Sequence, residues 1–388
     1  MMDDPWRCRP LGQLAAGLVV LLIGCTDCTA LLADEPAAAI VEAPAAVVTK
    51  ACAVWPRAQD QVWAVSSRGL GCDVTAGTQR LRYWRYDREQ SWVKANLDEL
   101  LAGDDPEVVT TVFIHGNRID HCEAFSKGWN AYRRLVACAD ERPVRFVIWS
   151  WPSDPIRGPI QDARIKASRT NPAGYYVAWF VDRLQPGAPV SLWAHSYGAR
   201  IATGALHLLG GGSVAGYRLK DSQAEPRRPV QAVLLASAVD DHWLLPGHAH
   251  GQAMSQLDGL LLVNNGCDNL LKRYQILYPG RGCEQALGYV GLATSRLMAD
   301  DAAKVRQLDA ANVVGREHLF ANYLCSPGLV AQMRTHLLFE GQSLPVAQSP
   351  PIVPSNAASE DLSEGDVAES DAAEAAEGDV SVLLTNDN

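Results

Sequence analysis

A serine at position 196 has the sequence surroundings that a nucleophile requires. It is the central residue of A-H-S-Y-G (residues 194–198), which separates an apolar, strand-like run over residues 190–194 from a segment with helical spacing. A chain that passes from strand to helix with almost no loop turns sharply, and only small residues fit on both sides of the bend. The turn exposes the hydroxyl of Ser196 and places the backbone N–H of Tyr197 at a helix N-terminus, where the dipole favours negative charge. The pattern predicts nucleophilic catalysis by Ser196; the alternative is a serine that only caps the helix.

A serine hydroxyl needs a base, and the base needs a carboxylate that orients it. After this kind of turn the acid and the histidine are expected to follow in that order. Asp268 comes just after an apolar strand-like run, and His318 lies in a polar loop ahead of a terminal helical segment. We therefore predict a relay from Ser196 to His318 to Asp268, in which the acid fixes the tautomer of the imidazole.

Other acids and histidines compete for these two roles. Asp240 and Asp241 follow the preceding apolar run, and three further histidines lie at 242, 248 and 250. These histidines precede Asp268 in the chain, which does not fit the expected order. Ordinary surface positions are the simpler interpretation for most of them.

The remaining element of such a site is a pair of backbone N–H groups that bind a developing oxyanion. One is expected from Tyr197 and the other from the loop after the β-branched run over residues 108–114, where His115-Gly116-Asn117 follows. We assign the second donor to Asn117, with Gly116 allowing close approach; the alternative is that this loop only shapes a turn. Aromatic residues are candidates for an acyl pocket or for core packing: Trp149, Trp151, Tyr175, Tyr176 and Trp179.

A second small-x-Ser-x-Gly pattern provides a control. It reads A-F-S-K-G at residues 124–128, follows a polar stretch and lies inside a helical segment. No strand leads into it, so Ser126 lacks the context of a nucleophile and is interpreted as a coincidence.

The elements that must position these residues alternate along the chain. We expect strands at 61–66, 80–86, 108–114, 144–149, 190–194, 230–236 and 259–264, and helices at 92–101, 123–137, 175–184 and from the turn to 209. Alternating strands and helices predict right-handed crossovers and a mostly parallel sheet with helices on both faces. Ligands bind such sheets at the carboxyl ends of the strands, which is where the candidate residues fall.

Charge and composition limit the classes of partner. Ten acidic residues and no Lys or Arg lie beyond residue 342, and the remaining acidic residues balance the 34 basic ones. The rest of the chain carries no net charge, so it lacks the excess of basic residues that is typical of nucleic-acid binding. Beyond residue 33 it also contains no C-x-x-C or H-E-x-x-H motif, so the sequence gives no support for a metal site. We expect a catalytic domain over residues 59–342, an Ala/Pro-rich linker over 34–58 and a disordered acidic tail over 343–388.

The first 33 residues are predicted to be an export leader. Arg7 and Arg9 precede an apolar stretch over residues 11–24, and L-I-G-C at 22–25 resembles a bacterial lipobox in which Cys25 is lipidated. Cleavage after Ala30 or Ala33 is the competing interpretation. The body then carries seven cysteines, an odd number, so at least one stays free, while pairs such as 52–72 and 267–283 are open. The predicted location is the cell envelope or the exterior.

Several segments together resemble a known family. F-I-H-G-N-R (113–118), V-I-W-S-W-P-S-D (147–154), L-W-A-H-S-Y-G (192–198), N-N-G-C-D (264–268) and G-R-E-H-L-F (315–320) are similar to the bacterial esterase/lipase-like α/β-hydrolases catalogued as DUF900. The resemblance covers roughly residues 60–340 and implies an α/β-hydrolase fold with Ser196, Asp268 and His318 as the triad. Tyr197, the pair 199–200 and Leu319 depart from the family pattern without removing a triad member.

The resemblance implies hydrolysis of a small-molecule carboxylic ester or thioester through an acyl-serine, with no cofactor. Two alternatives remain at this point: a serine peptidase or amidase, and a non-catalytic hydrolase-fold module that binds a partner at the envelope.

Overall fold

A computed structural model describes residues 38–39, 55–71, 73–220, 228–277 and 284–342. All of them belong to the first of the two units into which the chain divides, Met1–Ala347 and Gln348–Asn388. The predicted leader (1–33), most of the predicted linker and the acidic tail (343–388) lie outside the described residues, as do Cys25, Cys52, Cys72 and Cys283. Cys267 is an exposed, free cysteine.

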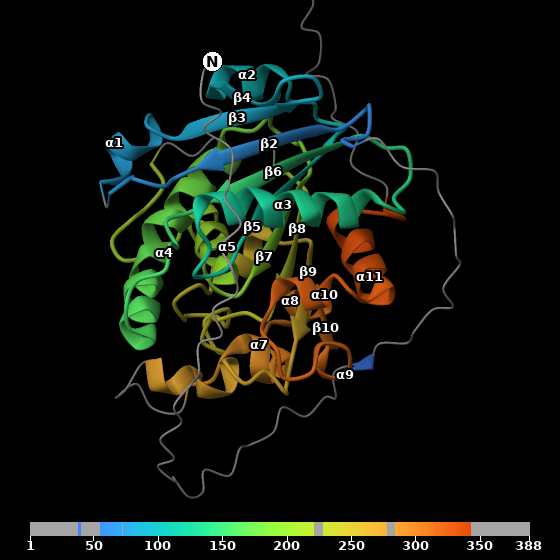
Figure 1. The fold of residues 1–388 in the computed structure, drawn as a ribbon. Coiled ribbons are helices and arrows are strands. Elements are labelled where there is room, and N and C mark those ends of the chain that lie inside the picture. Colours follow the sequence, from blue (N-terminus) through green and yellow to red (C-terminus); the bar gives the residue numbers. More distant parts are fainter. Residues whose placement is uncertain (1–37, 40–54, 72, 221–227, 278–283, 343–388) are drawn as a thin grey trace, which may run out of the picture. The chain divides into compact units, whose positions relative to one another are not determined.

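The described strands form one sheet of ten, in the order β1-β10-β9-β8-β7-β5-β6-β2-β3-β4. Their bounds are β1 Ala38–Ala39, β2 Gln61–Ser66, β3 Arg82–Asp87, β4 Ser91–Ala95, β5 Val109–Ile114, β6 Val144–Ser150, β7 Val190–His195, β8 Val230–Leu235, β9 Gly259–Asn264 and β10 Val305–Asp309. Pairing is parallel throughout except where β3 runs antiparallel to its neighbours β2 and β4. Figure 1 shows the twist of this sheet.

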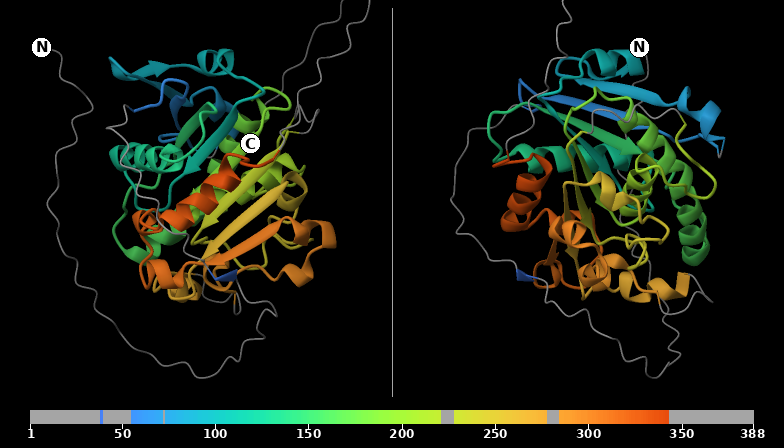
Figure 2. Two further views of the ribbon diagram at one scale, coloured as in Figure 1. Left: turned by 90° about the vertical axis from the view of Figure 1, so that its right-hand side faces the viewer. Right: turned by 180° about the vertical axis from the view of Figure 1, so that it is seen from behind.

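Helices cover both faces of the sheet. The longer ones are α3 His121–Val136, α4 Pro159–Asp182, α5 Tyr197–Leu209 and α11 Pro327–Leu337. Helix α3 contacts α11 in one helical layer, and α4 contacts α5 in the other (Figure 2). The shorter helices are α1 Val74–Thr78, α2 Leu97–Ala102, α6 Ala253–Gln256, η1 Leu271–Leu277, α7 Leu287–Val290, η2 Thr294–Arg296, α8 Ala299–Ala303, α9 Ala311–Val314 and α10 Phe320–Tyr323. The predicted α/β-hydrolase fold, a mostly parallel sheet between helices, is confirmed.

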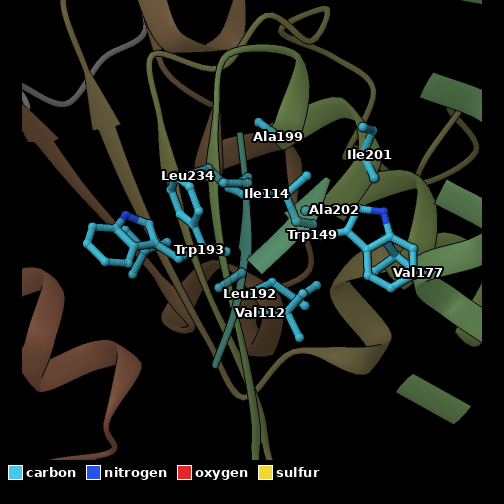
Figure 3. Packing of buried hydrophobic residues seen from close by; sticks show 14 of the residues in the cluster. Val112, Ile114, Trp149, Val177, Leu192, Trp193, Ala199, Ile201, Ala202 and Leu234 are labelled. Atoms are coloured by element: carbon cyan, nitrogen blue, oxygen red, sulfur yellow. The ribbon is translucent and has the colours of Figure 1, made fainter. Parts of the chain in front are cut away.

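The central strands are buried on both faces, which explains their continuous apolar sequences. Every residue of β5, β7, β8 and β9 is buried. Figure 3 shows side chains of β5, β7 and β8 packed with those of α4 and α5. A fully buried Leu or Val contributes roughly 1.5–3 kcal/mol relative to an exposed one, so this cluster holds the site's scaffold in place.

Most predicted elements are found within two residues of their expected bounds, but two predictions were wrong in extent or type. The expected helix over 92–101 is the strand β4 followed by the short helix α2. Tertiary pairing decides this, since Tyr86 of β3 and Trp92 of β4 lie opposite each other with ring centroids 5.3 Å apart. The expected helix over 175–184 is the second part of α4, which begins at Pro159 and contains Pro172.

The aromatic candidates for an acyl pocket belong mainly to the core. Trp149 and Trp151 are 0 % exposed, and Tyr175 and Tyr176 are also buried. Trp179 is partly buried, and the guanidinium of Arg183 lies 3.9 Å from its ring centroid. Packing is therefore the role that the structure gives these side chains.

Candidate active site

Ser196 forms the whole connection between strand β7 and helix α5. Its backbone has φ 55° and ψ −120°, and positive φ is uncommon for a residue with a side chain. Strained backbone of this kind gathers at functional sites. Gly198 is required here, because a Cβ at that position would lie 2.2 Å from the carbonyl oxygen of Ile114. The helix can therefore approach the end of β5 only if residue 198 has no side chain.

The structure brings Ser196, His318 and Asp268 into one hydrogen-bonded row. His318 Nε2 lies 2.8 Å from the Ser196 hydroxyl oxygen, and His318 Nδ1 lies 2.6 Å from Asp268 Oδ2. Both distances are within hydrogen-bond reach. Since a carboxylate only accepts, Nδ1 of the neutral imidazole carries the proton and Nε2 is free to accept the serine proton. The arrangement has the geometry of a nucleophile, a base and an orienting acid.

Asp268 is fixed on both of its oxygens. It is fully buried, and Oδ1 accepts the backbone N–H groups of Leu270 at 2.8 Å and Leu271 at 3.0 Å. Oδ2 is left for His318. A buried carboxylate without such partners would be very costly, so these bonds both stabilise the charge and set its direction.

Two loops meet to hold this pair. Asn265 donates through its amide to the carbonyl of Gly315 at 2.8 Å, and the backbone N–H of Asn269 donates to the carbonyl of Arg316 at 3.1 Å. The loop after β9, which carries the acid, is thereby joined to the loop after α9, which carries the histidine. The hydrogen bonds between the two loops therefore help to hold Asp268 beside His318.

His195 is a further residue of the site that the sequence did not single out. Its ring is buried and its Nε2 lies 3.1 Å from the backbone carbonyl of His318. Burial lowers the pKa of His195 well below its ordinary value, and the neighbouring His318 adds a smaller effect in the same direction. The ring is therefore neutral, and its Nε2–H donates to the carbonyl of His318. The only signal in the sequence was a polar residue at the end of an apolar strand.

The loop after β5 passes directly against the nucleophile. A Cβ on Gly116 would lie 3.1 Å from the Cβ of Ser196 and 2.9 Å from Nδ1 of His195. Glycine therefore permits the close approach that the sequence predicted at this position. The close approach is between Gly116 and Ser196. The two predicted oxyanion donors come directly after these residues in the chain, Asn117 after Gly116 and Tyr197 after Ser196.

A buried ion pair holds the Asn117 side chain. Its amide donates to Asp162 at 2.8 Å, while the other oxygen of Asp162 accepts from Lys166 at 3.1 Å and from the backbone of Ile156 at 2.8 Å. Burial raises the pKa of Asp162, but these hydrogen bonds outweigh it and the net shift is downward. The carboxylate stays charged and ties the loop to helix α4. The predicted role of Asn117 concerns its backbone N–H, which this side-chain hydrogen bond does not use.

The competing acids and histidines lie elsewhere. Asp240 accepts the hydroxyl of Tyr274 at 2.6 Å, and Asp241 lies 3.1 Å from its neighbour His242. His250 is buried beside Thr203, 2.8 Å from its hydroxyl, and His248 is exposed. The two ring nitrogens of His318 are engaged by Asp268 and Ser196, so neither alternative acid is the partner of this imidazole. Ser126 is an exposed residue inside α3.

Within the described ranges, no group of three or more His, Cys, Asp and Glu side chains could hold a metal ion. Over the same residues, no helix combines the length and the apolar character needed to cross a membrane.

No protein-family model matches the chain, and no curated protein matches it. Among solved structures, an acetylxylan esterase is 13% identical and aligns over 60% of this chain and 99% of its own, with a TM-score of 0.32. Esterase B from Lactobacillus rhamnosis is 11% identical and aligns over 72% of this chain and 88% of its own, with a TM-score of 0.33. Both TM-scores are below 0.5, so neither similarity bears on the chemistry of this site.

Proposed function

We propose that the protein is an exported serine hydrolase that cleaves a small-molecule carboxylic ester, or a thioester, through an acyl-serine intermediate. The observation that carries the proposal is the row of hydrogen bonds from Ser196 through His318 to Asp268. It stands at the carboxyl ends of the strands, beside a glycine loop suited to binding an oxyanion. The resemblance to the DUF900 esterase/lipase-like family supports the choice of an ester over a peptide bond.

In the proposed reaction, the Ser196 oxygen attacks the ester carbonyl carbon as His318 Nε2 takes the hydroxyl proton. The imidazolium that forms is stabilised by the buried Asp268. Backbone N–H groups of Tyr197 and Asn117 bind the oxyanion, and each such donor is typically worth about 3–4 kcal/mol of transition-state stabilisation. Collapse of the tetrahedral intermediate breaks the bond to the alcohol, which leaves with the proton from His318.

Water completes the cycle. His318, again neutral, removes a proton from a water molecule that attacks the acyl carbon, and the second tetrahedral intermediate releases the carboxylic acid. The proton returns to Ser196, so one ester and one water give one acid and one alcohol. These steps use only groups of the chain and the solvent, and we propose no cofactor.

We further propose that the hydrolase acts at the bacterial cell envelope. The support is the leader-like sequence before residue 34 and the lipobox-like L-I-G-C, in which Cys25 would be the anchored residue. Labelling with a radioactive fatty acid, compared between the full chain and its Cys25→Ser variant, tests the anchor. Loss of label in the variant is the expected result.

A matched pair of serine variants tests the catalytic proposal. Wild-type protein is expected to react with a fluorophosphonate probe and to hydrolyse p-nitrophenyl esters faster than peptide amides. Ser196→Ala should lose the label and lower kcat by at least about 10⁴-fold. Ser126→Ala, which changes the other serine in a small-x-Ser-x-Gly pattern, should keep both the reaction with the probe and the wild-type kcat.

Each contrary outcome removes a particular part of the proposal. Faster cleavage of amides would make the protein a peptidase or amidase. Folded wild-type protein that neither reacts with the probe nor turns over esters would favour the non-catalytic binding module.

A further inference from the structure

Three of the seven large apolar side chains that are exposed among the described residues belong to the segments that carry Asp268 and His318. Among the described residues, Leu270, Ile276 and Leu319 are 52%, 55% and 61% exposed. We call these three side chains the apolar rim. Leu270 donates its backbone N–H to Asp268, Leu319 follows His318 directly, and Ile276 lies in η1, which begins right after Leu270. Solvent-exposed leucine and isoleucine are common singly, but a group beside a proposed active site points to an apolar ligand.

Exposed basic residues accompany the rim. Lys272 and Arg273 lie between Leu270 and Ile276, and Arg316 lies three residues before Leu319. Glu317 is an exposed acid among them. Apolar side chains with neighbouring cations match the surface of a phospholipid layer, where acyl chains receive the apolar groups and anionic headgroups attract the basic ones.

The path of the N-terminal chain leads to the same edge of the sheet. Strand β1 pairs with the last two residues of β10, Ala38 opposite Leu308 and Ala39 opposite Asp309. In Figure 1, β1 lies at the end of β10. The loop with His318 follows β10 on that edge. Twelve residues lie between Cys25 and Ala38, and the thirteen steps from one to the other span at most about 45 Å when fully extended. A lipid on Cys25 would therefore limit the distance between the membrane and β1, at the carboxyl edge of the sheet, to that length.

We propose that the apolar rim docks on the surface of an anionic phospholipid layer, so that the active site takes its ester substrate from that layer rather than from solution. The inference rests on the proposed function for the identity of the substrate, but the docking itself does not require catalysis. The three rim side chains enter the acyl region while Lys272, Arg273 and Arg316 contact the headgroups.

The test separates docking from both catalysis and the lipid anchor. The full chain carrying Ser196→Ala and Cys25→Ser is sedimented with vesicles of phosphatidylcholine alone, or of phosphatidylcholine with phosphatidylglycerol. We expect binding to the anionic vesicles, weakened by salt because exposed charges are screened. Changing Leu270, Ile276 or Leu319 to Asp should each lower the vesicle partition coefficient by about tenfold, the order expected for losing an apolar side chain from the lipid.

Met298→Asp is the matched control. Met298 is 69% exposed, but it precedes α8, which leads to the opposite end of β10, where Lys304 accepts the N–H of Leu260. This variant should bind vesicles as the parent does. Thermal unfolding of each variant verifies that a weaker binder is still folded.

The outcomes distinguish the two proposals. If the parent does not bind vesicles, or if rim and control variants bind equally, docking on lipid is refuted, while hydrolysis of dissolved p-nitrophenyl esters by the wild type would leave the proposed function intact. If the wild type neither hydrolyses esters nor reacts with the fluorophosphonate, the proposed function fails, and rim-dependent vesicle binding would still support docking.

Discussion

Replacing His115 by Gln should remove part of the acid sensitivity of this fold. The ring of His115 is 1% exposed. Its Nδ1 lies 2.9 Å from the carbonyl of Gly116, and its Nε2 accepts the backbone N–H of Trp151 at 3.3 Å. Only the neutral ring can donate from one nitrogen and accept at the other. Burial, and then the charge of Arg68, lower the pKa of His115 to about 3.

The size of the effect follows from proton linkage. In the unfolded chain a histidine has a pKa of about 6.5, so between pH 6.5 and the folded pKa the unfolded state binds more protons. The free energy of unfolding therefore falls as the pH is lowered through this window. At pH 5 the difference of about 1.5 pH units from 6.5 corresponds to about 2 kcal/mol for this one ring.

Urea unfolding at pH 7 and at pH 5 measures the effect. The drop in the free energy of unfolding between the two pH values should be about 2 kcal/mol smaller in His115→Gln than in the wild type. The other buried histidines are present in both proteins, so the difference isolates His115. His248→Gln should keep the wild-type drop, because its ring is exposed in the folded chain. An equal drop in all three proteins would refute the neutral, buried assignment of His115.

Three further variants test the geometry of the site. Gly198→Ala should lower the free energy of unfolding by about 1–3 kcal/mol in urea melts, since its Cβ would meet a backbone carbonyl of β5; Gly328→Ala, where the added Cβ meets nothing within 4 Å, should not. His195→Phe should lower kcat for a p-nitrophenyl ester about tenfold with little change in KM, because the carbonyl of His318 loses its donor. His195→Gln, which can still donate, should recover part of this rate, and equal loss in both variants would contradict the positioning role. Asp268→Asn should lower kcat by roughly 10⁴-fold without unfolding the protein, because the imidazole loses its orienting carboxylate; circular dichroism verifies the fold.

Local geometry explains why the central elements were predictable from the sequence. The runs that became β5, β7 and β9 are long enough for strands and too short for typical helices, and their burial on both faces requires continuous apolar sequence. The strand that became β4 shows the limit. Residues 92–95 fit helical spacing equally well, and only pairing of Trp92 against Tyr86 across the hairpin decides the outcome. Short apolar segments are ambiguous in this way until a partner is known.

Helix α4 shows a second limit of local patterns. The sequence pattern predicted only residues 175–184 as helix, and Pro172, a residue type that usually ends a helix, lies before that range. The helix continues through Pro172 because α4 packs against α5, where the lack of a side chain at Gly174 allows close approach to the backbone of Ile201. Packing energy from neighbouring elements outweighs the local cost.

The sequence alone determined the place of the sharp turn at Ser196, because the steric demands of a strand-to-helix junction act on adjacent residues. It also determined the order of the acid and the histidine along the chain. Only the tertiary structure decided that the carboxylate beside the imidazole belongs to Asp268 rather than Asp240, and that His195 holds the loop of His318. These choices depend on contacts between loops from 50 to more than 100 residues apart, and the position of each loop is set by the packing of the whole sheet rather than by its neighbours in sequence.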